Sequence, residues 1–197
     1  MNKIFESGTF SKYRNLANIN ESISATRSCL DGHRMTTKKT VFLSHKHDEL
    51  DELKDVIGFL QKEFDVMVYI DSKDKNMPLI TSGETAMRIK NIIKQSDKFI
   101  LLATEGAIDS KWCNWELGYG DALKYQDKIA LLPIKPQKSS NISYKGNEYL
   151  EIYPYISYFH GYEMYTDGRT IEEGYYVVKI EPDRTKTIEP LSTWFKY

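Results

Sequence analysis

The sequence predicts an α/β fold of the flavodoxin-like type, an open parallel sheet with helices on both faces. Short apolar runs such as TVFLS at 40–44 and DKFILLA at 97–103 are typical of buried strands. Segments with apolar residues at helical spacing separate these runs. Because each crossover between parallel strands must return over the sheet, this alternation favours helices on both faces.

The first two strand–helix units lie between residues 40 and 95. After the strand at 40–44, the apolar residues of DELDELKDVIGFLQKEF repeat at helical spacing up to Phe64. The run DVMVYID at 65–71 predicts the second strand. A polar loop then leads to TSGE, where Thr81 and Glu84 form a capping-box pattern that predicts the start of the next helix.

The third and fourth strands flank the sequence DSKWCNWELGYGD. The third strand is expected at 97–103, and Asp109 or Ser110 is expected to cap the helix that follows. DKIALLPI at 127–134 predicts the fourth strand. The alternation of strand and helix therefore repeats three times.

Two flanking segments differ in composition from this core at 39–135. Residues 1–38 are polar and are expected to form an N-terminal arm with room for one helix. Residues 136–197 contain 10 of the 14 tyrosines and predict a C-terminal extension with one or two strands and a closing helix after Pro190. The tyrosines are expected to pack on the core with their hydroxyls at the rim.

Length and charge restrict the class of protein. A chain of 197 residues favours one domain, and a net charge of -1 argues against nucleic acid as a partner. The apolar runs are far shorter than the roughly 20 residues of a membrane helix. The N-terminus lacks the apolar segment of a secretory signal, and two cysteines offer one disulfide at most. We therefore expect a soluble cytoplasmic protein with no membrane contact.

The unusual polar residues follow the predicted strands. Ligands of such folds bind beyond the carboxyl ends of the strands, where SHKHDE, DSKDKNMP and TEGAIDSKW lie. Trp112 and Glu116 are four residues apart and share one helix face, one turn beyond this edge. Taken alone, this helix favours core tryptophans beside a solvated glutamate over a catalytic glutamate.

Other chemical motifs are incomplete. LSHKHDE resembles the HxHxD pattern of metallo-hydrolases, but Leu50 stands where the next histidine should be, so no metal is expected. We expect Ser44 and His45 to hydrogen-bond a substrate instead, with a solvated turn left open for His47 and Asp48. The sequence contains no G-x-G-x-x-G after the first strand, no Walker lysine loop and no G-x-S-x-G elbow.

The stretches VFLSHKHDE, VYID, DKFILLAT and above all SKWCNWELGYGDA resemble a bacterial TIR (Toll/interleukin-1 receptor) domain over residues 39–135. The family's catalytic glutamate lies in a W-x-x-x-E stretch, which falls on Glu116. Many bacterial and plant members cleave NAD between nicotinamide and ribose, and standalone bacterial members often make a nucleotide signal in antiphage systems of the Thoeris type. The resemblance therefore implies an NAD glycohydrolase or cyclase.

The resemblance also implies roles for other residues. Substrate contacts are expected from the residues Ser44, His45, Lys46, Asp71, Trp112 and Trp115, although a turn role for Asp71 stays open. The loop at Met77 and Pro78 resembles the family loop that gates the site and makes TIR–TIR contacts. NAD is then a substrate with no separate cofactor, self-association is expected, and the product would bind a downstream effector.

The expected chemistry explains a single carboxylate. Nicotinamide leaves a positively charged ring as a neutral base, so no general acid is needed, unlike in ordinary glycoside cleavage. One carboxylate suffices to stabilise the developing oxocarbenium charge. Two alternatives stay open: a non-catalytic TIR–TIR interaction module, and an enzyme like the nucleoside deoxyribosyltransferases, which also use a glutamate on N-glycosides.

Overall fold

A computed structural model describes residues 4–16, 19–32, 36–47, 50–72, 82–124, 126–137 and 148–197. The described residues form one eight-stranded sheet in the order β3-β2-β4-β5-β6-β7-β8, with β1 paired to β5. The strands are β1 (Phe5–Glu6), β2 (Thr40–Ser44), β3 (Met67–Tyr69), β4 (Lys98–Ala103), β5 (Ile129–Lys135), β6 (Tyr155–Phe159), β7 (Gly174–Ile180) and β8 (Lys186–Pro190).

The central strands are parallel, as predicted. β2 pairs in parallel with β3 and β4, β4 with β5, and β5 with β6. Counted from β2, these five strands have the order 2-1-3-4-5, which is that of flavodoxin-like sheets. The point where the strand order reverses therefore lies between the carboxyl ends of β2 and β4.

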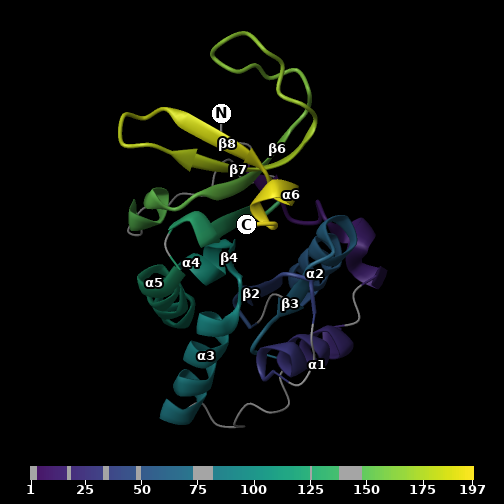
Figure 1. The fold of residues 1–197 in the computed structure, drawn as a ribbon, viewed down its shortest axis with the longest axis vertical. Coiled ribbons are helices and arrows are strands. Elements are labelled where there is room, and N and C mark those ends of the chain that lie inside the picture. Colours follow the sequence, from purple (N-terminus) through teal and green to yellow (C-terminus); the bar gives the residue numbers. More distant parts are fainter. Residues whose placement is uncertain are drawn as a thin grey trace.

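Helices cover both faces of the central strands (Figure 1). The α-helices are α1 (Ile19–Leu30), α2 (Leu50–Phe64), α3 (Gly83–Gln95), α4 (Glu105–Ile108), α5 (Lys111–Lys124) and α6 (Leu191–Trp194). Figure 1 shows α3, α4 and α5 on one side of the strands and α1 and α2 on the other. Short 3₁₀ helices are η1 (Ser11–Leu16), η2 (Gln126–Lys128) and η3 (Glu148–Ile152).

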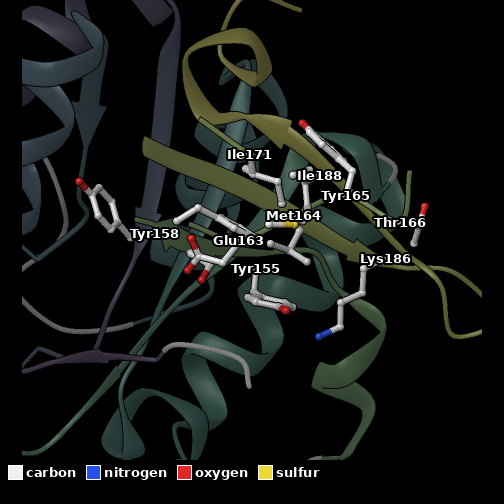
Figure 2. A pocket seen from close by; sticks show the side chains of 12 residues that line it. Tyr155, Tyr158, Glu163, Met164, Tyr165, Thr166, Ile171, Lys186 and Ile188 are labelled. Atoms are coloured by element: carbon white, nitrogen blue, oxygen red, sulfur yellow. The ribbon is translucent and has the colours of Figure 1, made fainter. Parts of the chain in front are cut away.

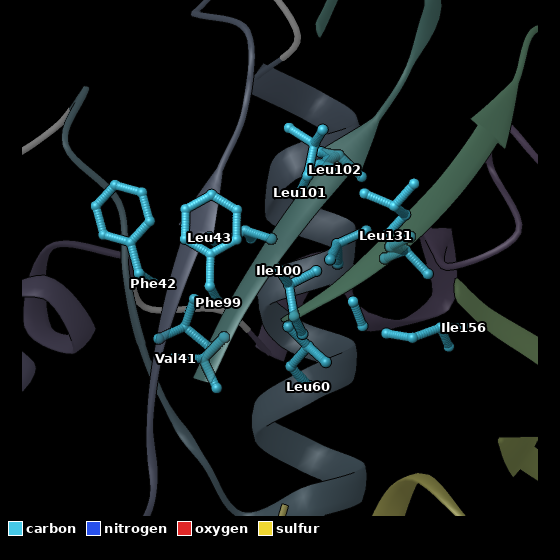
Figure 3. Packing of buried hydrophobic residues seen from close by; sticks show 14 of the residues in the cluster. Val41, Phe42, Leu43, Leu60, Phe99, Ile100, Leu101, Leu102, Leu131 and Ile156 are labelled. Carbon is cyan, nitrogen blue, oxygen red and sulfur yellow. The ribbon is translucent and has the colours of Figure 1, made fainter. Parts of the chain in front are cut away.

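The core explains why the strands are almost wholly apolar. β2, β4 and the first six residues of β5 are buried along their length, because helices cover both of their faces. Figure 3 shows Leu60 of α2 among side chains of the central strands, close to Ile100. Burial of such side chains contributes about 1.5–3 kcal/mol each.

The N-terminal arm packs into this core. Phe10 is fully buried, and its ring lies 4.4 Å from that of Phe59 on α2. At the free edge of β3, the hydroxyls of Ser22 and Thr26 on α1 donate to the carbonyl of Val68 at 3.0 and 3.3 Å. α1 thus covers an edge that would otherwise expose unpaired backbone groups.

The C-terminal extension lengthens the sheet. β6 adds a fifth parallel strand beside β5, and β7 and β8 continue the sheet in antiparallel order. Tyr175 of β7 packs against Phe59 with ring centroids 4.6 Å apart. The predicted boundaries at 38 and 135 stay predictions, since arm, core and extension share this sheet and core.

Some local expectations were wrong. The helix α3 begins at Gly83 with Ser82 as its cap, where the Ser82 N–H donates to Thr85 Oγ1 at 3.1 Å; the predicted partner Thr81 lies outside the described residues. The short helix α4 was not predicted, although Thr104 caps it by accepting from the Ala107 N–H at 3.1 Å. In the part of the chain that the structure describes, no helix is long and apolar enough to cross a membrane.

Candidate active site

Helix α5 places Glu116 beneath the carboxyl edge of the sheet. Ser110 caps this helix as predicted, because its Oγ accepts from the Cys113 N–H at 3.3 Å. Glu116 lies one and a half turns further along and is only 1% exposed. Ionisable side chains are almost never buried this deeply without a partner.

Ser44 is that partner. It is the last residue of β2, and its hydroxyl donates to Glu116 Oε2 at 2.5 Å. The strand end and the helix face are therefore joined by a hydrogen bond between residues 72 positions apart. The other carboxyl oxygen, Oε1, is buried without a hydrogen-bond partner among the described residues.

The surroundings of Glu116 favour its neutral form. Burial raises the pKa of Glu116 well above the ordinary carboxyl value, and the negative charge of Asp71 raises it further. Hydrogen bonding to Ser44 and Trp112 offsets a part of this rise. An acid with one unsatisfied oxygen in such a setting is an arrangement found at functional sites.

His45 is held in one tautomer. Its Nδ1 lies 3.2 Å from the carbonyl oxygen of Leu43, which can only accept, so Nδ1 carries the proton. Its Nε2 then accepts from the hydroxyl of Ser72 at 2.7 Å. Burial lowers the pKa of His45, against the nearby charge of Asp71, so the ring is neutral.

Asp71 lies between two histidines at the end of the second core strand. Its Oδ1 is 4.0 Å from Nδ1 of His45, and its Oδ2 is 3.7 Å from Nε2 of His47. The side chain of Asp71 is 10% exposed, whereas that of His47 is 57% exposed. The structure therefore brings a second carboxylate within electrostatic reach of Glu116.

Comparison with known proteins identifies the family. The model of the TIR domain family matches residues 41–170, about two thirds of the chain. The chain belongs to the TIR domain family. A relative from Bacillus cereus (strain MSX-D12), named "Probable 3' cyclic ADP-D-ribose synthase ThsB'", is 31% identical over 119 residues. The match covers 59% of this chain and 60% of that relative, so this chain spans less than two thirds of the relative's length.

The tryptophans of this TIR domain lie in a row of neighbouring aromatic rings along α5. The rings of Trp112 and Trp115 are 5.0 Å apart, and Trp115 stacks on Tyr119 at 6.2 Å. Both tryptophans are half-buried. Trp112 precedes Glu116 by about one turn of α5, and its indole lowers the pKa of that carboxyl, while Trp115 lies on the adjacent flank.

Other predicted residues lie apart from Glu116 or outside the described residues. Lys46 is half-buried and lines a crevice whose lining does not include Glu116. Met77 and Pro78 fall outside the described residues. Cys113 is buried, and burial raises the pKa of its thiol to about 11, so it is protonated and packs as a small apolar group.

Sequence reasoning missed two residues of the site. Ser72 was not considered, although it directly follows Asp71, and His47 was given no role beyond the solvated turn that was left open for it. The spacing of His45 and His47 on one strand-end loop was the available signal for His47. Within the described ranges, no group of three or more His, Cys, Asp or Glu is arranged to hold a metal ion.

A second pocket lies on the C-terminal extension of the TIR domain. It has a volume of about 360 Å³ over β6, β7 and β8 and is lined by none of the predicted site residues. Figure 2 shows Tyr155, Met164, Ile171 and Ile188 around it, with the ring of Tyr158 turned away. The tyrosine-rich extension therefore contributes a hollow whose lining is separate from the residues around Glu116.

Proposed function

We propose that this TIR domain cleaves NAD at the bond between nicotinamide and ribose. The observation that carries the proposal is the Glu116 carboxyl, buried at the carboxyl edge of the sheet, with Oε2 bound to Ser44 and Oε1 without a hydrogen-bond partner among the described residues. A free carboxyl oxygen in a low-dielectric site interacts strongly with a cation placed beside it.

The chemistry requires no second acid. Departing nicotinamide takes the electrons of the C–N bond and becomes neutral, and the positive charge moves to the ribose as an oxocarbenium ion. Glu116 in its ionised form stabilises that charge, and the cationic substrate itself favours loss of the Glu116 proton. In this account Ser44 orients the carboxyl and Trp112 forms an aromatic wall beside it.

The second half of the reaction needs a base. Water or a hydroxyl of the ADP-ribosyl group attacks the ribose carbon and must lose a proton. Asp71 with His47 is placed to accept it, because the exposed histidine lies 3.7 Å from the carboxylate. The products would be nicotinamide and ADP-ribose or a cyclised form of it.

The relative supports a signalling role. Its name assigns it synthesis of a cyclic ADP-ribose, and it shares 31% identity with this chain over 119 residues. We infer that this chain likewise makes an ADP-ribose-derived nucleotide that acts on a separate effector in antiphage defence. Self-association through TIR–TIR contacts would then complete or expose the site.

Mass spectrometry of NAD incubated with the purified protein tests this proposal. The expected result is nicotinamide together with an ADP-ribose-derived product, from the protein alone or when it is assembled. Parallel reactions with deoxynucleosides and free bases address the deoxyribosyltransferase alternative. Base exchange on deoxynucleosides with intact NAD would replace our proposal by that alternative.

One observation favours the non-catalytic alternative. Glu116 is 1% exposed, so no substrate reaches it in the described conformation. An interaction module would form a specific complex with itself or another TIR domain that survives Glu116→Ala, and would release no nicotinamide in any assembly state. Our proposal instead requires that substrate or assembly opens this site.

A further inference from the structure

Asp71 lies just beyond the end of β3, where backbone pairing no longer fixes the chain. The pairing between β2 and β3 ends at Phe42 and Tyr69, two residues before Asp71. The carboxylate of Asp71 lies 4.0 Å from His45 Nδ1 and 3.7 Å from His47 Nε2. Both distances exceed that of a hydrogen bond. The position of this carboxylate therefore depends on the backbone that carries it.

This backbone is fixed on both sides of Asp71. On one side, Ile70 is fully buried in the core. On the other side, the hydroxyl of Ser72 donates to Nε2 of His45 at 2.7 Å. Since the backbone pairing of β2 and β3 has already ended, this side-chain hydrogen bond joins the two chain segments at the level of Asp71.

The imidazole of His45 is a rigid support for the Ser72 hydroxyl. It is only 2% exposed, and its Nδ1–H donates to the carbonyl of Leu43 on the buried strand β2 at 3.2 Å. With the proton on Nδ1, the ring has one lone pair left, on Nε2, and the Ser72 hydroxyl occupies it. In the described conformation both ring nitrogens are thus engaged within the protein, which fixes the orientation of the ring.

The place of Asp71 matters because of its neighbours. Burial, and after it the charge of Asp71, raises the pKa of Glu116. Asp71 is also the carboxylate of the base proposed above, together with the exposed His47. The other titratable groups beside this pair of carboxyls are His45 and Cys113, and burial favours the neutral form of both. Asp71 is therefore the negative charge that acts on Glu116, and its effect depends on where the loop holds it.

We propose that Ser72 is a positioning residue, which holds the Asp71 carboxylate beside Glu116 through the imidazole of His45. Ser72 acts through Asp71 and not by contact with the reacting atoms. The inference rests on the proposed function for its effect on turnover. Its effect on the two carboxyls can be measured in the protein without any substrate.

NMR titration of labelled glutamate side chains tests this geometry. In Ser72→Ala, Nε2 of His45 loses its donor and the loop is released on one side of Asp71. The carboxylate then moves away from Glu116, so the pKa of Glu116 should fall. Ser72→Thr keeps the hydroxyl and should restore the wild-type titration.

Ser96→Ala is the matched control. The hydroxyl of Ser96 also makes a short hydrogen bond, 2.8 Å to the carbonyl of Ile92, and the residue is buried. It lies just before β4, at the opposite edge of the sheet from Glu116. This variant should lose stability through its missing hydrogen bond and leave the Glu116 titration unchanged.

A double-mutant cycle separates positioning from a general loosening of the site. In Asp71→Asn the charge that Ser72 positions is absent, so the addition of Ser72→Ala should change the pKa of Glu116 no further. Equal shifts in the two backgrounds would overturn the proposal. An unaltered Glu116 pKa in Ser72→Ala, with thermal melts showing a folded protein, would overturn it as well.

Kinetics distinguish this inference from the proposed function. With NAD, Ser72→Ala should lower kcat on the order of tenfold while KM stays within about twofold, since a displaced base affects the chemical steps and not binding. The expected pKa shifts without nicotinamide release by the wild type would contradict the proposed function and leave the positioning role intact. Release by the wild type, with unaltered kcat and Glu116 pKa in Ser72→Ala, would contradict the positioning role alone.

Discussion

At the scale of the residue, the site depends on burial of an ionisable group, Glu116, in surroundings that disfavour its charged form. Two carboxyl groups, Glu116 and Asp71, lie close together in a region with little access to water. Burial and the neighbouring charge of Asp71 raise the pKa of Glu116 and so favour its neutral form. Stability is lost at this position when Glu116 ionises, which is a common cost of active-site chemistry.

The variant Glu116→Gln should therefore be more stable than the wild type at neutral pH. The pKa of Glu116 is higher in the folded state than in the unfolded chain, so its contribution to stability is full below the ordinary carboxyl pKa and is lost as pH rises towards the folded value. Glutamine is neutral throughout. In thermal melts the unfolding temperature should rise by about 2–4 °C for each kcal/mol of stability gained. This rise should be smaller in acid. A less stable variant at neutral pH would contradict a neutral Glu116.

Removal of the Asp71 charge should lower the pKa of Glu116. In Asp71→Asn the second cause of the raised value is gone, while burial and the bond to Ser44 stay. Carbon-detected NMR titration of labelled glutamate side chains measures the change directly. Glu84→Gln, on the exposed surface of α3, is the control and should leave the Glu116 titration in place. An unchanged pKa in Asp71→Asn would show that the two carboxyls do not interact.

At the scale of the element, some glycines lie where a helix packs so closely on its neighbour that a larger side chain would collide. On α5, Gly120 lies close to a neighbouring side chain, because a Cβ there would be 3.2 Å from the ring of Phe99, but the space beside Gly118 is open. On α2, a Cβ at Gly58 would lie 2.2 Å from the carbonyl oxygen of Tyr13.

Two alanine substitutions in helices should thus have opposite effects. Gly58→Ala forces the backbone of η1 away from α2 and should cost about 2–4 kcal/mol. Gly118→Ala meets nothing within 4 Å and should gain about 1 kcal/mol from helix propensity. Urea unfolding measures both free energies. Equal effects of the two substitutions would refute the close contact between α2 and η1.

At the scale of the whole molecule, the sequence predicted the parallel core and the edge at which the site lies. Periodicity sufficed there, because strands such as β4 are buried along their length and α2 has one apolar face. It missed β8, none of whose five residues is buried, and α4, which has a single turn. The neighbours of Glu116 could be predicted from the sequence only in part, since the Asp71–His47 contact depends on two loops meeting in space.

The N-terminal arm should be required for stability. Phe10 and Tyr13 are buried against Phe59, so a fragment of residues 39–197 would expose this apolar face to water. We expect the unfolding temperature of the fragment to be at least 5–10 °C lower than that of the full chain, which corresponds to a loss of stability on the order of several kcal/mol. Aggregation of the fragment is the other expected outcome. Differential scanning calorimetry of both proteins is the measurement, and equal unfolding temperatures would contradict an integrated arm.

The central claim is that Glu116 promotes departure of nicotinamide from NAD. Nicotinamide release by the wild type, Glu116→Gln and the control Glu84→Gln, in the same assembly state and each shown to be folded, tests it most directly. The account predicts release by the wild type and the control, and a loss of at least 100-fold in Glu116→Gln, as for removal of a group that stabilises the transition-state charge. Undiminished release by a folded Glu116→Gln protein would contradict it.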